Sequence, residues 1–297
     1  MNNKNLIEEK ALKRSMVGAF LLAVWGIVMA SVSGSSVILL DGMFNLISGI
    51  MSFFSIEITR LISGKETRGY PLGYFAFESL FVLVKGASIL VLLLMALYSN
   101  IGVLLSGGRE PFLGLLTIYV ALAVLGCVVL YLTSRRGFKQ TGSEILQAET
   151  QAWLINAVVS GAIGIAFGIT MLLKGTPLGW IDRYIDQILV IVLSFLFIKD
   201  PIVLMKSGIK ELLLAAPQAQ YVKPFQDKLL PLKDQLHARS MAVEIIKTGR
   251  RLWLTIRFDP RDDEIRVDDF IKVKATLSEA AREVYENTQT EVLLERI

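Results

Sequence analysis

The sequence predicts an α-helical membrane protein with six transmembrane helices, followed by a small cytoplasmic α+β domain. Three observations predict this fold class. Hydrophobic residues make up 53% of the 297 residues and the mean hydropathy is +0.55, which exceeds the values typical of soluble domains. Six apolar stretches are each long enough to cross a bilayer. Charged residues crowd into the last third of the chain, so a composition shift near residue 206 predicts two domains, 1–206 and 207–297.

The six apolar stretches each reach the length of about 20 residues that a transmembrane helix needs. Breaker residues separate the first from the second at "SVSGSS" and the fifth from the sixth at "KGTPLGW". We therefore expect an integral, multi-pass membrane protein. The predicted spans are residues 15–34, 36–61, 79–100, 112–133, 148–173 and 185–205.

The distribution of Lys and Arg predicts the orientation of these spans. The N-terminal segment holds four such residues, the second-to-third connection three, and the fourth-to-fifth connection three, against three in all on the opposite side. Positive residues favour the cytoplasmic side of a membrane. Both ends of the chain are therefore predicted to be cytoplasmic, and we expect the protein in a bacterial inner membrane.

The last 90 or so residues have the pattern of a small domain. A short helix in "SGIKELLLAAPQ" and an amphipathic helix over 219–237 precede two alternating segments, "MAVEIIKTG" and "RRLWLTIRFDP". Helical spacing returns in "VDDFIKVKATLSEAAREVYEN", and "TEVLLERI" closes the chain as a strand. This αββαβ order predicts a three-stranded sheet with two helices on one face.

Several function classes are not expected. The chain shows no nucleophile and base pair, no phosphate-binding loop and no His/Cys cluster, so we predict neither an enzyme nor a bound cofactor. The net charge of +4 comes without a basic patch interleaved with aromatic residues, which argues against nucleic acid as a partner. The single cysteine, Cys127, cannot form a disulfide within the chain.

Polar residues inside the apolar stretches predict a site. In "LLDGMFNLISG", Asn45 follows Asp41 by four residues and Ser48 follows it by seven, so the three share one face of a helix. An ionisable residue in a transmembrane helix costs at least about 2.5–3.5 kcal/mol and normally faces a cavity or a partner. Asp41 is therefore the first candidate for a functional residue.

The fifth apolar stretch carries a second polar face. In "AETQAWLINAVVSG", Glu149, Asn156 and Ser160 are spaced by seven and four residues. Carboxylate and amide oxygens from two helices suit a cation, and Asp41 could exchange a proton for a metal ion. The alternative is that the Ser and Asn side chains only join helices, and that Glu149 is an interfacial charge.

These features together resemble a known family. The pair formed by Asp41 and Asn45, the segments "RGYPLGYFAFES" and "AWLINA", and the αββαβ domain after "GIKELLLAAP" are similar to those of the cation diffusion facilitators. The resemblance is closest to the branch of predicted cobalt/zinc/cadmium transporters. It implies a homodimeric antiporter that exports divalent metal cations from the cytoplasm in exchange for protons.

The resemblance also implies a set of metal ligands. The family takes two ligands from the second span and two from the fifth, each pair four residues apart and usually His or Asp followed by Asp. The matching positions are Asp41 with Asn45, and Ala152 with Asn156, so the candidate metal ligands are Asp41, Asn45 and Asn156. The family often has a histidine just before the third span, and Tyr74 stands at that position in this sequence. Without imidazole ligands, binding of Zn²⁺ is expected to be weak.

The C-terminal domain resembles the metallochaperone-like domain of the same family. It holds one histidine, His237, and no cysteine, which predicts dimerisation without a His-rich zinc site. Asp259, Asp262, Asp263 and Glu264 are acidic, but they surround Pro260 at the end of a strand. We interpret them as a solvated turn.

Two hypotheses of function remain open at this stage. In the first, the protein exports a divalent cation by proton antiport through Asp41, Asn45 and Asn156. In the second, it is a non-transporting or heterodimeric relative that acts as a membrane scaffold or regulatory subunit. Side-chain oxygens that point at one another favour the first hypothesis, whereas oxygens capped by neighbouring helices favour the second.

Overall fold

A computed structural model describes residues 3–62, 67–109, 113–141, 144–173, 176–177, 179–261 and 264–295. The chain divides into two compact units, each built from two segments. The first unit comprises Met1–Glu57 and Lys85–Val203, and the second comprises Ile58–Val84 and Leu204–Ile297. Helices α2, α3 and α7 each contribute residues to both units.

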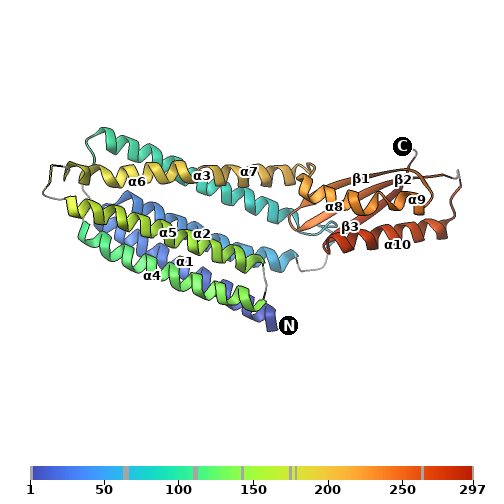
Figure 1. The fold of residues 1–297 in the computed structure, drawn as a ribbon, viewed down its shortest axis with the longest axis horizontal. Helices are drawn as coiled ribbons and strands as arrows, with labels where there is room; N and C mark the ends of the chain where they lie inside the picture. Colours follow the sequence, from blue (N-terminus) through green and yellow to red (C-terminus); the bar gives the residue numbers. More distant parts are fainter. Residues whose placement is uncertain are drawn as a thin grey trace. The chain divides into compact units, whose positions relative to one another are not determined.

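The first two-thirds of the chain is helical (Figure 1). Among the described residues, six helical stretches are long and apolar enough to cross a membrane, the last of them formed by η1, α6 and α7 together. This confirms the six predicted spans. The helices are α1 (Asn3–Ser33), α2 (Ser36–Ile62), α3 (Ala76–Leu105), α4 (Leu113–Thr141), α5 (Glu144–Leu173), the 3-10 turn η1 (Gly179–Ile181), α6 (Asp182–Phe197) and α7 (Lys199–Leu212).

One boundary differs from the prediction. The segment "SGIKELLLAAPQ" was expected to form a short helix of its own, but residues 207–212 belong to α7, which begins at Lys199. The helical path changes at Ile198, between α6 and α7. Lys199, Asp200 and Pro201 follow Ile198 directly, so the sequence does carry a signal for this boundary, but the predicted span 185–205 ran through it.

Glycines allow the helices of the first unit to approach closely. A Cβ atom added to Gly26 of α1 would lie 2.7 Å from the Cα of Gly42 of α2, and one added to Gly164 of α5 would lie 2.4 Å from Val120 of α4. In Figure 1, α4 runs beside both α1 and α5. Small residues at such crossings are typical of helix pairs in membranes, where backbones pack directly.

The second unit ends in a mixed sheet covered by helices on one face (Figure 1). Strand β2 pairs with β1 antiparallel and with β3 parallel, in the order β1-β2-β3. Phe225 and Leu277 pack from α8 and α10 against Leu254 and Ile256 of the sheet. The predicted αββαβ fold is thus confirmed. Its elements are α8 (Ala219–Leu229), α9 (Leu232–Gln235), β1 (Ala238–Thr248), β2 (Arg251–Pro260), α10 (Val267–Val284) and β3 (Thr288–Leu294).

The turn between β1 and β2 is held by two carboxylates from helices of the same unit. Glu78, in the first turn of α3, accepts hydrogen bonds from the backbone N–H (2.9 Å) and the Nε (3.2 Å) of Arg250. Glu211, in the last turn of α7, accepts one from the backbone N–H of Gly249 (3.1 Å) and one from Lys247 Nζ (2.6 Å). Charge-assisted bonds of this kind are roughly twice as strong as neutral ones.

Gly249 is the residue that lets this turn approach the helices. Its φ is +56°, in the left-handed region that favours glycine. A Cβ atom here would lie 2.6 Å from Glu78 Oε2 and 2.8 Å from the backbone oxygen of Phe75. Its N–H also lies 3.1 Å from the Oγ of Ser79, a buried side chain. No other residue type satisfies the backbone conformation and the close approach together.

Replacing Gly249 with alanine should therefore destabilise the second unit. The left-handed backbone alone costs a side-chain-bearing residue about 1–2 kcal/mol, and the contact with Glu78 adds to that cost. Thermal unfolding of the purified protein, followed by circular dichroism, would measure the loss. Gly69→Ala is the matched control, because a Cβ at Gly69 meets nothing within 4 Å and should leave the unfolding temperature unchanged.

Candidate cation site

Asp41 lies on α2 and is hydrogen-bonded by a tyrosine of another helix. The hydroxyl of Tyr119, on α4, donates to one carboxylate oxygen of Asp41. Tyr119 is buried, whereas Asp41 is half-buried. The other carboxylate oxygen takes no hydrogen bond from a described residue. One oxygen of Asp41 is thus held in place, and one remains available to a ligand.

Asn45 supplies a second oxygen one helical turn away. Its Nδ2 donates to the backbone oxygen of Asp41 at 3.0 Å, which fixes the side chain along the helix. Its Oδ1 is buried and has no hydrogen-bond partner within the described structure. A buried polar atom without a partner costs about 1–3 kcal/mol, so such atoms call for an explanation. An incoming cation would give this oxygen a partner.

A small cavity adjoins Asp41. Its volume is about 20 Å³, enough for one particle of the size of a water molecule. Apart from Asp41, the side chains that line it are apolar and come from three helices. They are Val37, Leu40 and Phe44 of α2, Val159 and Ile163 of α5, and Leu193 and Phe197 of α6.

The third predicted ligand, Asn156, is not linked to this pair. It is half-buried on α5 and makes no hydrogen bond with a described residue. Ala152, at the fourth family position, is exposed. The residues of α5 that border the cavity of Asp41 are Val159 and Ile163, one turn or more beyond Asn156. The structure therefore brings together Asp41 and Asn45, and the role of Asn156 stays a prediction.

Glu149 is engaged elsewhere. Its carboxylate accepts a hydrogen bond from the hydroxyl of Ser15 on α1. The same Ser15 oxygen accepts a bond of 2.6 Å from the indole N–H of Trp153. Ser15 and Trp153 are both buried. The contact joins α1 to α5, and no described contact places Glu149 at the position that Ala152 leaves without a ligand.

The helix crossing at Gly26 and Gly42 positions the Asp41 pair. A Cβ atom at Gly26 would also lie 3.5 Å from the hydroxyl oxygen of Tyr119, so this crossing lies beside the hydrogen bond to Asp41. Direct contact between the two backbones leaves room for no side chain there. The position of the Asp41 carboxylate is thus set by the packing of α1 and α4 against α2.

Comparison with known families identifies the chain. The profile of the cation efflux transmembrane domain matches residues 12–213, well over half of the sequence. The chain belongs to the cation diffusion facilitator family. This cation diffusion facilitator is therefore an integral membrane protein of a transporter family, and it carries cations. Among proteins with curated descriptions, none matches it.

The structure of this cation diffusion facilitator contains a buried carboxylate that the sequence analysis did not single out. Asp186 of α6 accepts hydrogen bonds from Ser35 Oγ (2.5 Å) and from the backbone N–H groups of Ser36 (2.7 Å) and Val37 (3.3 Å). It is only 1% exposed. The sequence did carry a signal for this residue, because Asp186 is an ionisable residue inside the sixth apolar stretch. The spacing of residues along the sequence did not indicate its hydrogen-bond partners.

The C-terminal domain of the facilitator offers no comparable group of ligands. Within the described residues, no three His, Cys, Asp or Glu side chains gather closely enough to hold a metal ion. His237 is exposed. Asp259 was predicted to lie in a solvated turn, but this is wrong: it is buried within β2, and its carboxylate lies 3.4 Å from Ser240 Oγ. Asp262 and Asp263, part of the acidic turn predicted from the sequence, lie outside the described residues.

Tyr74, which stands where the family often has a histidine, belongs to an aromatic cluster before α3. Its ring centroid lies 4.6 Å from that of Tyr70 and 6.0 Å from that of Phe77. Its hydroxyl lies 3.2 Å from Thr67 Oγ1. These contacts give Tyr74 a packing role in the connection between α2 and α3.

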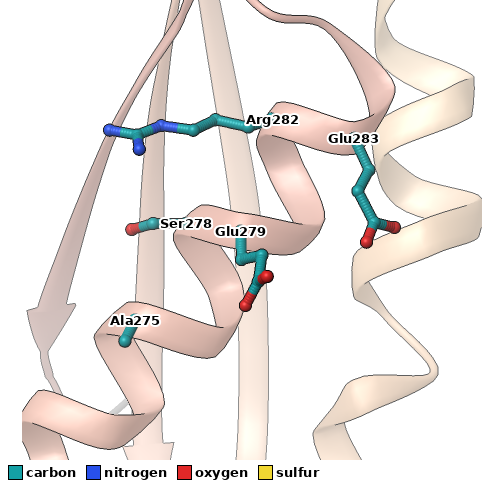
Figure 2. Close-up of a pocket in the computed structure, with 5 residues that line it drawn as sticks. All are labelled: Ala275, Ser278, Glu279, Arg282 and Glu283. Carbon is teal, nitrogen blue, oxygen red and sulfur yellow. The ribbon is translucent and has the colours of Figure 1, made fainter.

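A shallow hollow on α10 is also not a metal site. Figure 2 shows two carboxylates there, together with the guanidinium group of Arg282. One of these carboxylates, that of Glu283, pairs with Lys228 of α8 at 2.8 Å. No three His, Cys, Asp or Glu side chains of the described residues gather here, so the carboxylates form part of a solvated surface. The hollow is lined by Ala275, Ser278, Glu279, Arg282 and Glu283.

Removing the hydroxyl of Tyr119 should destabilise the membrane domain. Tyr119→Phe leaves a carboxylate oxygen of Asp41 unpaired, which costs about 1–3 kcal/mol. Unfolding of the detergent-solubilised protein by denaturant would measure this loss. The effect should shrink in an Asp41→Asn background, because a double-mutant cycle isolates the pairwise contact. Tyr98→Phe is the control, since Tyr98 is 86% exposed.

Proposed function

We propose that this cation diffusion facilitator exports a divalent cation from the cytoplasm in exchange for protons, with Asp41 as the charged ligand and proton acceptor. One observation supports the proposal above the others. The carboxylate of Asp41 and the Oδ1 of Asn45, which no described residue hydrogen-bonds, lie one turn apart on α2 in the membrane domain. Paired oxygen donors in hydrocarbon suit a cation, because they replace its hydration shell.

Amide oxygens complete the proposed donor set. Asn45 and Asn156 act as neutral ligands beside the single carboxylate of Asp41. Asn156 makes no hydrogen bond with a described residue, so its side chain can turn toward the cavity at Asp41 without breaking one there. A set of one carboxylate and two amides holds a hard divalent ion better than Zn²⁺, which favours imidazole and thiolate ligands.

Proton coupling follows from the chemistry of the carboxylate. A ligand must be deprotonated to bind a metal ion, so cation binding releases a proton from Asp41. When the cation leaves, the carboxylate takes up a proton again, since a charge in hydrocarbon is costly. The Tyr119 hydroxyl can keep its hydrogen bond to one oxygen while the other exchanges its proton for the cation.

Orientation and assembly form part of the proposal. The excess of Lys and Arg in the N-terminal segment and in the connections after α2 and α4 supports cytoplasmic ends. The N-termini of α2, α4 and α6 then lie on the outer side. The αββαβ domain at the C-terminal end of the chain supports a homodimer, as in the family that the chain belongs to.

A second function is favoured by one observation. Tyr119 already caps Asp41, and no described hydrogen bond links Asn156 to the pair, as would be expected of a non-transporting relative. Such a protein would act as a membrane scaffold or as the regulatory subunit of a heterodimer. Its Asp41 would then serve only to join α2 to α4.

Flux measurements separate these functions. The purified protein, reconstituted in proteoliposomes with an imposed pH gradient, should move divalent cations from a panel of Zn²⁺, Cd²⁺, Mn²⁺, Co²⁺ and Mg²⁺. Asp41→Ala should abolish the flux, because it removes the charged ligand and the proton acceptor. Asn45→Ala should weaken it about tenfold, which is the change expected from losing about 1.4 kcal/mol of binding free energy.

The matched control is Asp234→Asn. Asp234 is an exposed carboxylate of α9 in the C-terminal domain that pairs with Arg261, and its loss should leave the flux unchanged. Flux that persists in Asp41→Ala would remove Asp41 from the mechanism. Absence of flux for every ion, with binding also undetectable by calorimetry, would support the scaffold function instead.

A further inference from the structure

The buried carboxylate of Asp186 joins the beginning of α2 to α6. Its oxygens accept from Ser35 Oγ at 2.5 Å, and from the backbone N–H groups of Ser36 and Val37 at 2.7 Å and 3.3 Å. These N–H groups belong to the first turn of a helix and have no partner within α2. A carboxylate at this end also complements the positive end of the helix dipole. Asp186 therefore caps α2 from a different helix.

The connection that leads into α2 is as tightly held as its first turn. Only Gly34 and Ser35 separate α1 from α2. Gly34 has a φ of +72° and donates its N–H to the backbone oxygen of Ala30 at 2.9 Å, which ends α1. The Ser35 hydroxyl, besides donating to Asp186, accepts from the N–H of Ile38 at 3.3 Å. The segment that Asp186 binds therefore has little conformational freedom, because both residues of the connection are held by hydrogen bonds.

The same end of α6 holds another connection. The backbone N–H of Arg109, between α3 and α4, donates to the backbone oxygen of Arg183 at 2.8 Å. A Cβ atom at Gly108 would lie 2.3 Å from that oxygen, so the two backbones are in contact. The first turn of α6 therefore fastens the α3–α4 connection as well as α2.

Asp41 lies five residues beyond Ser36 on the capped helix. The cavity beside Asp41 is walled by Val37 and Leu40 from α2, and by Leu193 and Phe197 from α6. These are the two helices that Asp186 joins, and Val37 takes part in both the cavity wall and the cap. Residues of α5 form the rest of the wall, and separation of α2 from α6 would open a path from Asp41 to the end where α2 begins.

We propose that Asp186 is the outer gate of the transport pathway: its carboxylate holds α2 against α6 and closes the path from Asp41 to the outside. This proposal rests on the proposed function, which assigns the ends of α2 and α6 to the outer side. Opening breaks the bonds to Ser35, Ser36 and Val37, and the cation then leaves Asp41 between the two helices. Reclosure restores the cap before the next cation binds.

Accessibility of the cavity to a reagent on the outer side tests the gate without relying on transport. The full-length protein in sealed vesicles carries Leu40→Cys as the reporter, because Leu40 is 4% exposed and lines the cavity. A membrane-impermeant maleimide is added outside. The parent protein, whose one cysteine is the buried Cys127, gives the background rate.

Loss of the cap should speed this labelling. We expect Asp186→Asn to raise the labelling rate of Leu40→Cys about tenfold, the change in open population that the loss of one charge-assisted hydrogen bond produces. Ser35→Ala, which removes one hydroxyl and leaves the carboxylate in place, should raise it about threefold. The second variant keeps the test decisive if Asp186→Asn does not fold.

Two controls distinguish opening between α2 and α6 from a general loss of helix packing. Ser194→Ala removes a buried hydroxyl of α6 that has no hydrogen-bond partner among the described residues, and should leave the labelling rate unchanged. Trp180→Cys reports on a residue of η1 that is 60% exposed, and its rate should not depend on Asp186. An unchanged rate for Leu40→Cys in both Asp186→Asn and Ser35→Ala, or an equal increase in Ser194→Ala, would overturn the gate.

Flux in the same vesicles distinguishes failure of the gate from failure of the proposed function. Loss of flux in Asp41→Ala together with unchanged labelling in the Asp186 and Ser35 variants overturns the gate alone. Faster labelling in those variants, in a protein that moves no cation, upholds the closure by Asp186 and overturns the export of cations. Both results are obtained from one set of reconstituted proteins.

Discussion

The membrane domain depends on one constraint: a polar side chain in hydrocarbon must find a partner, because no water is there to hydrate it. Three of the carboxylates in the membrane domain meet this constraint by bonding to another helix. Asp41 bonds to Tyr119, Asp186 to the beginning of α2, and Glu149 to Ser15. Each pair therefore ties two spans together as well as satisfying a charge or a dipole. The same contacts that make the polar residues tolerable also fix which helices are neighbours.

One exception to this rule lies beside Asp41, where we propose that a cation binds. Within the described structure, nothing bonds to the buried Asn45 Oδ1, and only one oxygen of the neighbouring Asp41 carboxylate accepts a hydrogen bond. Other buried polar atoms of the described helices also lack a hydrogen-bond partner, such as the hydroxyls of Ser160 and Ser194, but this amide oxygen lies one helical turn from a carboxylate. Glycines at the crossing of α1 and α2 keep this place compact, because the backbones meet without intervening side chains. The site is thus defined as much by close backbone packing as by its oxygen atoms.

The sequence was sufficient to predict what depends on periodicity. The length of the apolar stretches predicted the six spans. The spacing of apolar residues, alternating in strands and helical elsewhere, predicted the αββαβ order, because both patterns repeat within a short window. The sequence also located Asp41 and Asn45 on one helical face. It could not supply their partners, since Tyr119 lies 78 residues after Asp41 and Asp186 lies 151 residues after Ser35. Which helix meets which is decided by packing across the whole domain, and a single sequence carries no local mark of it. Asn156 remains a prediction for the same reason.

The anchoring of Gly249 and Arg250 has a practical consequence for work on the C-terminal domain. Two carboxylates hold this turn, and one of them, that of Glu78, comes from α3, more than a hundred residues earlier in the chain. A soluble fragment cut at residue 206 would retain Glu211 but lose Glu78, Ser79 and the ring of Phe75 that lies under Arg251 at 4.0 Å. Its turn would be free to adopt conformations that the intact protein forbids. Crystals or titrations of such a fragment would therefore describe a domain whose membrane-proximal end has been released from its natural restraint.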